Sequence, residues 1–249
     1  MKFTRFLSIV LPAALFICGC DNKNATNDRL NNAINQAQQG NWNTAGKEAA
    51  ELSAALPNAT APMLLRALAY EKQGDLAKAI DLARQCVTNS PKDFTSHYTL
   101  GRLYSLDPKR DAEAFTVLEK AHSLKPDDTD TLVLLCNIGI KRHEPNTDKY
   151  LNLLMHKPEF SNSAQLYYML GVRQAEKRNV MAAQRFMMNA LNKSGNANNP
   201  DLIYRIALCF DQNKFPPKEI KKFYNLFLRS KGVKNKADIA NARKRLRQL

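Results

Sequence analysis

The feature of the sequence that most restricts its fold is a repeat of 34 residues within residues 38–91. Three landmarks of the first stretch return in the second: Gly40 as Gly74, Ala45 as Ala79, and Pro57 as Pro91. Glycine can end a helix, alanine lets two helices approach closely, and proline stops a helix from continuing. The segments between these landmarks have the apolar period of helices. A period of this length, made of two helices and a Gly turn, is typical of a helical solenoid.

The same landmarks recur further along the chain. Leu100-Gly101 and Leu170-Gly171 occupy corresponding places, and Tyr104 follows the first of them. These residues, with the repeat above, resemble the tetratricopeptide repeat (TPR) family. The resemblance implies an all-α, right-handed solenoid of about six helix pairs over residues 29–230, with a basic capping helix over residues 231–249. Only nine glycines and no alternating strand patterns are present, which argues against a sheet.

The N-terminus has a different pattern. Lys2 and Arg5 precede a short apolar run over residues 6–17, which is too short to span a membrane and suits a signal peptide. The following Cys-Gly-Cys resembles the lipobox of bacterial lipoproteins. That resemblance implies cleavage of residues 1–19, acylation of Cys20 and a flexible tether over residues 20–28. The alternative is an ordinary secretory signal with a chance cysteine. Attachment to the inner or the outer membrane stays open.

The sequence contains no arrangement that predicts catalysis. It has no Gly-rich phosphate loop and no nucleophile motif, and its four histidines lack metal-binding spacing. The acidic run over residues 127–130 is better explained as a helix cap than as a cation site. We therefore expect no enzyme, no metal and no cofactor. The remaining cysteines are expected to be small core residues: Cys86, Cys136 and Cys209.

Partner binding is expected on the concave face. In the TPR family, positions 2, 5, 9, 12 and 13 of each first helix line the groove. Position 5 holds three tyrosines of an aromatic track, Tyr98, Tyr168 and Tyr204. Tyrosine offers apolar area with a polar end, so the track predicts a protein or peptide partner. An alignment slip of one position would instead pack these tyrosines between helices. The track is supplemented by Arg102, Asn137, Lys141 and Val172.

Positive charge is concentrated at the C-terminus. Residues 214–249 contain twelve Lys or Arg against Glu219 and Asp238, so they carry net +10 of the chain's +14. This favours anionic partners, which outside the cytoplasm are phospholipid headgroups, lipopolysaccharide or acidic proteins. The export signal argues against nucleic acid. A solvated cap that only keeps the repeats soluble is the alternative.

Taken together, the sequence predicts a lipid-anchored scaffold of the bacterial cell envelope that binds a protein or peptide. It is similar to the TPR lipoproteins of outer-membrane β-barrel assembly and of type IV pilus biogenesis, and no motif selects between them. Two other functions stay open. One is a membrane-surface module that docks on anionic lipid through the basic C-terminus. The other is a non-catalytic adaptor that regulates an envelope hydrolase.

Overall fold

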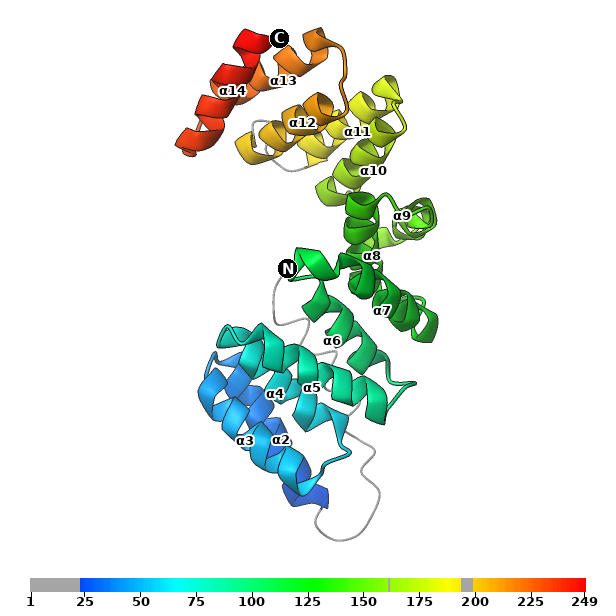
Figure 1. Cartoon of the computed structure of the whole chain (residues 1–249), viewed down its shortest axis with the longest axis vertical. Helices are drawn as coiled ribbons and strands as arrows, with labels where there is room; N and C mark the ends of the chain where they lie inside the picture. Colours follow the sequence, from blue (N-terminus) through cyan, green and yellow to red (C-terminus); the bar gives the residue numbers. More distant parts are fainter. Residues whose placement is uncertain (1–22, 161, 194–198) are drawn as a thin grey trace. The chain divides into compact units, whose positions relative to one another are not determined.

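The computed structural model describes residues 23–160, 162–193 and 199–249, and in this part of the chain every regular element is a helix (Figure 1). The expected all-α fold of six helix pairs and a capping helix is confirmed. The predicted signal peptide and Cys20 lie outside the described residues. The pairs are α2 (Lys23–Gln38) with α3 (Trp42–Ala55), α4 (Thr60–Lys72) with α5 (Leu76–Asn89), α6 (Phe94–Tyr104) with α7 (Asp111–Leu124), α8 (Thr129–Arg142) with α9 (Thr147–Met155), α10 (Ala164–Glu176) with α11 (Val180–Lys193), and α12 (Pro200–Gln212) with α13 (Pro217–Arg229). The last helix is α14 (Lys236–Gln248), and short 3-10 turns cover Pro108–Arg110 and Pro158–Phe160.

The helix α2 begins earlier than the sequence suggested. Residues 23–28, expected as part of a flexible tether, form its first turns. The apolar residues of this helix start only at Leu30, which is 2% exposed. Once a helix is nucleated, each added residue costs little, so a polar segment can extend a helix whose buried part is further on. The tether prediction is therefore corrected for residues 23–28.

Contacts divide the chain into two compact units, one ending at Ile138 and one over Gly139–Leu249, with the boundary inside α8. In the first unit, α2 to α7 contact one another in chain order, and the first helices α2, α4 and α6 also touch their neighbours. Its cluster of buried side chains includes Leu30, Ile34 and Leu65, with Trp42 packed against it. Consecutive pairs thus bury the apolar faces that one pair alone would expose.

Close approach of helices in this unit depends on Gly101. A Cβ built on Gly101 would lie 2.6 Å from Cγ of Leu118, which is fully buried in α7. Real Cβ contacts are not this short. The missing side chain is therefore what allows α6 to pack so closely on α7.

Short polar side chains begin most of the first helices. Asp93, Ser163 and Asn199 each accept a hydrogen bond from a backbone N–H of the following helix. At the acidic run, Asp128 is 7% exposed and accepts hydrogen bonds from N and Oγ1 of Thr131, at 2.9 and 2.7 Å. The capping role expected for this run is confirmed.

The second unit has an aromatic core. Phe210 of α12 meets Phe223 of α13 edge-to-face, with ring centroids 5.1 Å apart. The capping helix α14 contacts α13 (Figure 1). It buries Ala242 completely and packs the partly buried Ile239 and Leu246 on the same core. The apolar side of this helix therefore closes the end of the core.

The turns after the first helices differ between the units. Gly40 and Gly74 have φ near +87° and +84°, whereas the corresponding residues in the second unit are basic: His143, Arg178 and Lys214, with φ of 57°, 58° and 54°. Non-glycine residues adopt this conformation at a cost. For Arg178 and Lys214, the positive side chain after the C-terminus of a helix offsets part of that cost through the helix dipole.

Candidate functional site

A cleft of about 700 Å³ opens in the second unit on the first helices of its three helix pairs. The end of α8 supplies one wall, α10 the middle and α12 the other wall. We call it the first-helix cleft. It is lined by Ile140, Lys141, His143, Tyr168, Val172, Glu176, Arg205, Leu208, Cys209, Gln212 and Asn213.

The centre of the cleft is a tyrosine–arginine stack. The guanidinium carbon of Arg205 lies 4.4 Å from the ring centroid of Tyr168. Burial raises the pKa of Tyr168, so its hydroxyl is neutral at physiological pH. Arg205 is exposed, and no carboxylate of the described residues lies within ion-pair distance of it. The stack therefore holds a cation in a fixed orientation at the cleft surface.

The acidic residue of the cleft is already neutralised. Glu176 is 12% exposed at its side chain, and its Oε2 lies 3.0 Å from Nη1 of Arg173. Its Oε1 is 3.2 Å from Nδ1 of His143, at the rim. Arg173 also pairs with Asp148 at 3.1 Å and, by hydrogen bonding, holds the pKa of that carboxyl below its usual value. Arg205 is exposed in the same cleft and presents its charge to a ligand.

The cysteine of the cleft is not poised as a nucleophile. Cys209 is 5% exposed, and burial raises the pKa of its thiol to about 12. A thiol in this state is protonated at neutral pH and unreactive. Nδ2 of Asn213 donates to the carbonyl oxygen of Cys209 at 2.8 Å, which fixes the amide at the cleft edge. Cys86, Cys136 and Cys209 are free and buried, as expected.

Three of the predicted partner-binding residues meet in this cleft: Lys141, Tyr168 and Val172. Arg102 lies in the first unit and is paired with Glu71, with its Nη1 2.9 Å from Oε1. Both side chains of this pair are mostly buried, at 14% and 13% exposed. Asn137 is exposed on α8 and does not line the cleft.

The other two tyrosines of the predicted track are buried, which corrects the expectation of three accessible rings. Tyr98 is 0% exposed and stacks on Phe94, with centroids 5.8 Å apart. Tyr204 is 8% exposed because it packs 4.7 Å from the ring of Phe227 and lies beside Asn241 and Asp238 of α14. The capping helix thus covers the position that would continue the track.

Sequence reasoning missed Arg205. It stands one place after Tyr204, outside the groove positions of the family, and it enters the cleft because it reaches over the ring of Tyr168 on the preceding first helix. An arginine next to a groove position, with a tyrosine on the previous first helix, was the available signal.

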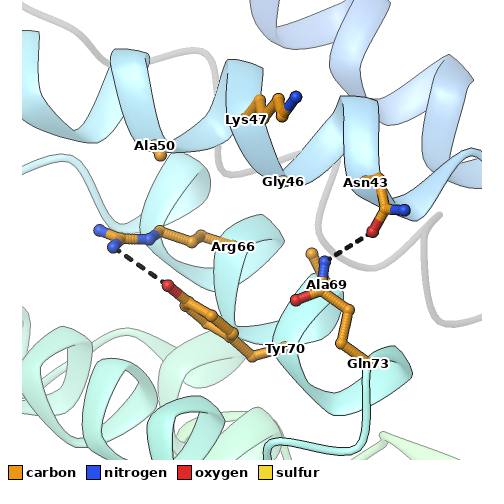
Figure 2. A pocket seen from close by; sticks show the side chains of 8 residues that line it. All are labelled: Asn43, Gly46, Lys47, Ala50, Arg66, Ala69, Tyr70 and Gln73. Carbon is orange, nitrogen blue, oxygen red and sulfur yellow. Dashed lines mark hydrogen bonds between the residues drawn. The ribbon is translucent and has the colours of Figure 1, made fainter.

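A smaller pocket of about 320 Å³ lies in the first unit between α3 and α4 (Figure 2). Arg66 and Tyr70 point toward each other from α4, and Nη2 of Arg66 donates to the tyrosine hydroxyl at 3.3 Å. Across the pocket, Nε2 of Gln73 donates to Oδ1 of Asn43 at 3.0 Å. These contacts satisfy most of the polar groups that a ligand would use here.

No group of three or more His, Cys, Asp or Glu in the part of the chain that the structure describes could hold a metal ion. Of the helices described, none is long and apolar enough to cross a membrane.

Comparison with known proteins identifies the repeat. Residues 62–93 match the family model of the tetratricopeptide repeat. The sequence matches no curated protein significantly. Solved structures match over most of the chain at low identity. A tetratricopeptide repeat protein from Parabacteroides merdae has a TM-score of 0.71 at 10% identity, covering 90% of this chain and 86% of its own.

Two further structures are similar. YrrB, described as a TPR protein with an unusual peptide-binding site, has a TM-score of 0.61 at 14% identity and covers 79% of this chain and 97% of its own. MamA has a TM-score of 0.56 at 18% identity, covering 66% of this chain and 94% of its own. At such identities the likeness concerns the fold. Residues 62–93 therefore form a tetratricopeptide repeat, and most of the chain has the fold of solved TPR proteins.

Proposed function

We propose that the chain is a scaffold that binds an extended peptide segment of a partner protein in the first-helix cleft. The observation that carries this proposal is the convergence of three successive first helices on one cleft whose centre is the Tyr168–Arg205 stack. A cleft of about 700 Å³ is within the usual size of ligand sites. The similar fold of YrrB, described as peptide-binding, supports the same class of ligand.

The cleft offers a peptide both apolar and polar contacts. Ile140, Val172 and Leu208 supply apolar surface, one from each first helix. Arg205, held on Tyr168, presents guanidinium N–H groups to carbonyl or carboxylate oxygens. Because the arginine is already oriented by the ring, less side-chain entropy is lost on binding.

The test is a selection of peptides from a random library displayed on phage, using the whole protein as bait at 0.15 M NaCl. Selected peptides are synthesised and titrated against Tyr168→Ala and Arg205→Ala. Each substitution removes a central contact, so we expect affinity to fall about 10-fold or more. Thermal unfolding should change little for Arg205→Ala because this side chain is exposed.

Matched controls are available in the same unit. Tyr167, the neighbour of Tyr168, faces Phe186 of α11 with ring centroids 6.4 Å apart. Arg185 is an exposed arginine over that same Phe186 ring. Tyr167→Ala and Arg185→Ala should leave peptide affinity unchanged. Equal loss in both sets of variants, or selected peptides that bind all variants alike, would contradict the proposal.

We also propose that the scaffold is anchored in the bacterial cell envelope through an acylated Cys20. The support is the lipobox resemblance of the N-terminal sequence. Two or more acyl chains give stable anchoring. Expression in a bacterial host with radiolabelled palmitate should label the wild type and not Cys20→Ala, while Cys86→Ala keeps the label. Labelled Cys20→Ala protein, or an unlabelled wild type, would refute the anchor without bearing on the cleft.

The identity of the bound partner would show in which pathway the scaffold acts. Capture of envelope proteins on the wild type and on Arg205→Ala, at 0.1 and 0.5 M NaCl, separates proteins held by the cleft from those held by charge alone. A component of outer-membrane assembly or of pilus biogenesis that is retained at high salt only by the wild type would select that pathway.

A further inference from the structure

The outward face of α14 carries several exposed positive charges. Lys236, Arg243, Lys244 and Arg247 are all exposed, and their spacing of seven, eight and eleven residues from Lys236 puts them on one side of the helix. We call these four residues the C-terminal basic stripe. It extends over about 16 Å along the helix axis.

The stripe contains no compensating charge. The acidic side chain of α14, Asp238, is partly buried and lies beside Tyr204, on the side of the helix that faces the core. None of the four basic side chains lies within ion-pair distance of a carboxylate among the described residues. By contrast, the inward Arg245 is paired, with Nε 2.7 Å from Oδ2 of Asp211. Folding therefore neutralises the inward arginine and leaves the outward charges unpaired.

The neighbouring helix α13 has the same distribution of charge, with exposed cations and a partly buried carboxylate. On α13, Lys218, Lys221, Lys222 and Arg229 are exposed. The acidic residue of α13, Glu219, is partly buried and accepts a hydrogen bond from Nε2 of Gln184 at 3.1 Å. The two last helices thus keep their carboxylates partly buried and most of their cations exposed, which produces a strong positive field at this end of the second unit.

The chemistry of the stripe decides which anionic partner fits. Between the charges, its face carries the small, exposed Ala240 and no aromatic or large apolar side chain. Protein interfaces and single-stranded nucleic acids need such side chains as anchors or stacking platforms. A single small anion would not contact charges spread over about 16 Å. A surface of anionic lipid headgroups needs only several cations on one flat face.

We propose that the C-terminal basic stripe of α14 docks on an anionic phospholipid surface. The contact is electrostatic and peripheral, because the stripe has no apolar side chain to insert. Binding through it is independent of the peptide proposed for the first-helix cleft. It should weaken strongly between 0.1 and 0.5 M NaCl, since the Debye length falls below its value of about 10 Å at 0.1 M.

The test measures the reactivity of individual lysines in the full chain. The protein is mixed with phosphatidylcholine vesicles that contain or lack phosphatidylglycerol and is modified briefly with an amine-reactive ester. Peptide mass analysis then reads each lysine separately, so attachment through another part of the chain does not affect the result. With phosphatidylglycerol at 0.1 M NaCl, we expect the reactivity of Lys236 and Lys244 to fall roughly threefold or more. Lys92 and Lys109, exposed in the first unit, should not change.

Variants sharpen the test. Arg243→Glu with Arg247→Glu keeps both reporter lysines and should abolish their protection, whereas Lys149→Glu with Arg185→Glu changes the net charge equally and should keep it. Ala240→Phe adds an inserting side chain and should make the protection resist 0.5 M NaCl. Hydrogen exchange of the α14 amides in the absence of vesicles shows whether the helix is still folded in each variant.

Two outcomes overturn the proposal. One is equal reactivity of Lys236 and Lys244 on vesicles with and without phosphatidylglycerol. The other is protection by polyglutamate but not by phosphatidylglycerol vesicles, which would assign the stripe to an acidic protein.

Discussion

Tyr167 and Tyr168 are adjacent in the chain and have different surroundings. The first faces Phe186 of α11, and the second lies under Arg205 in the cleft. On a helix, one step along the sequence turns a side chain by about 100°, so adjacent residues of one type take different roles. At this scale, the function of a residue depends on a single step of register.

The same dependence on register explains what the sequence could not predict. The family positions indicated Lys141, Tyr168 and Val172, and these three residues line one cleft. They could not show that Tyr204 is covered, because α14 lies outside the repeat pattern. The family positions also could not show that Arg205 enters the cleft. Its place over Tyr168 depends on how two neighbouring helices pack and not on the pattern of its own repeat.

The glycines of the first helices give a prediction about packing. Gly101→Ala would bring a Cβ to 2.6 Å from Cγ of Leu118 and 3.4 Å from its backbone nitrogen. Such overpacking should lower the free energy of unfolding by about 1–3 kcal/mol, measured by urea denaturation. Gly171→Ala is the matched case, since its Cβ meets the flexible side chain of Met187. It should cost less, and an equal or larger cost would show that the methionine cannot move aside.

Between elements, a mostly buried ion pair joins α4 to α6. Glu71 and Arg102 are the partners, and both come from first helices. Glu71→Gln removes one charge and leaves the other desolvated, so we expect a loss of about 3 kcal/mol in the free energy of unfolding.

An exposed pair in the same unit provides the control. Arg29 and Glu51 lie 2.6 Å apart with side chains 52% and 69% exposed. Glu51→Gln should cost less than about 1 kcal/mol because solvent screens this pair. Similar costs for Glu71→Gln and Glu51→Gln would mean that burial does not set the strength of the first pair.

The docking of α14 should depend on acid pH. Arg245 hydrogen-bonds to Asp211, as does the Tyr224 hydroxyl, and these bonds lower the pKa of the Asp211 carboxyl. A lowered pKa in the folded state gives stability that is complete above the unfolded value of about 3.9 and is lost as pH falls through the folded value. The hydrogen-exchange protection of α14 should therefore drop below about pH 4, ahead of that of α12.

Asp211→Asn tests the cause. Without the carboxylate, α14 should be weakly protected at every pH, and its protection should not fall further below about pH 4. A variant that keeps the wild-type pH profile would assign the acid sensitivity to another group.

Over the whole molecule, the fold was the most predictable part. The spacing between Gly40 and Gly74 indicated the period. In the structure, two successive first helices begin at Thr60 and Phe94, 34 residues apart. Each pair has the same local order of cap, helix, turn and helix, so a sequence pattern is enough to predict the fold. The division of contacts at Ile138 has no such local mark, because it depends on packing summed over many residues.

A chain in which helices touch mainly their neighbours should respond locally to damage. Ile34→Ala removes a side chain that is 2% exposed in the core of the first pair, and it should cost about 2–5 kcal/mol there. Hydrogen exchange should accelerate in α2 to α5 and stay unchanged in α12 and α13. Acceleration throughout the chain would indicate one cooperative unit instead.

The capping helix has a final consequence for assembly. Under α14 lie Tyr204, Tyr224 and Phe227, a set of rings that is buried in the complete chain. A chain cut after Ser230 would expose these rings to water as an apolar surface at its end. An exposed apolar end of this kind can pair with the same end of a second molecule. The thirteen residues of α14 therefore keep these rings from associating with a second copy, and the shortened protein should sediment as species whose size rises with concentration.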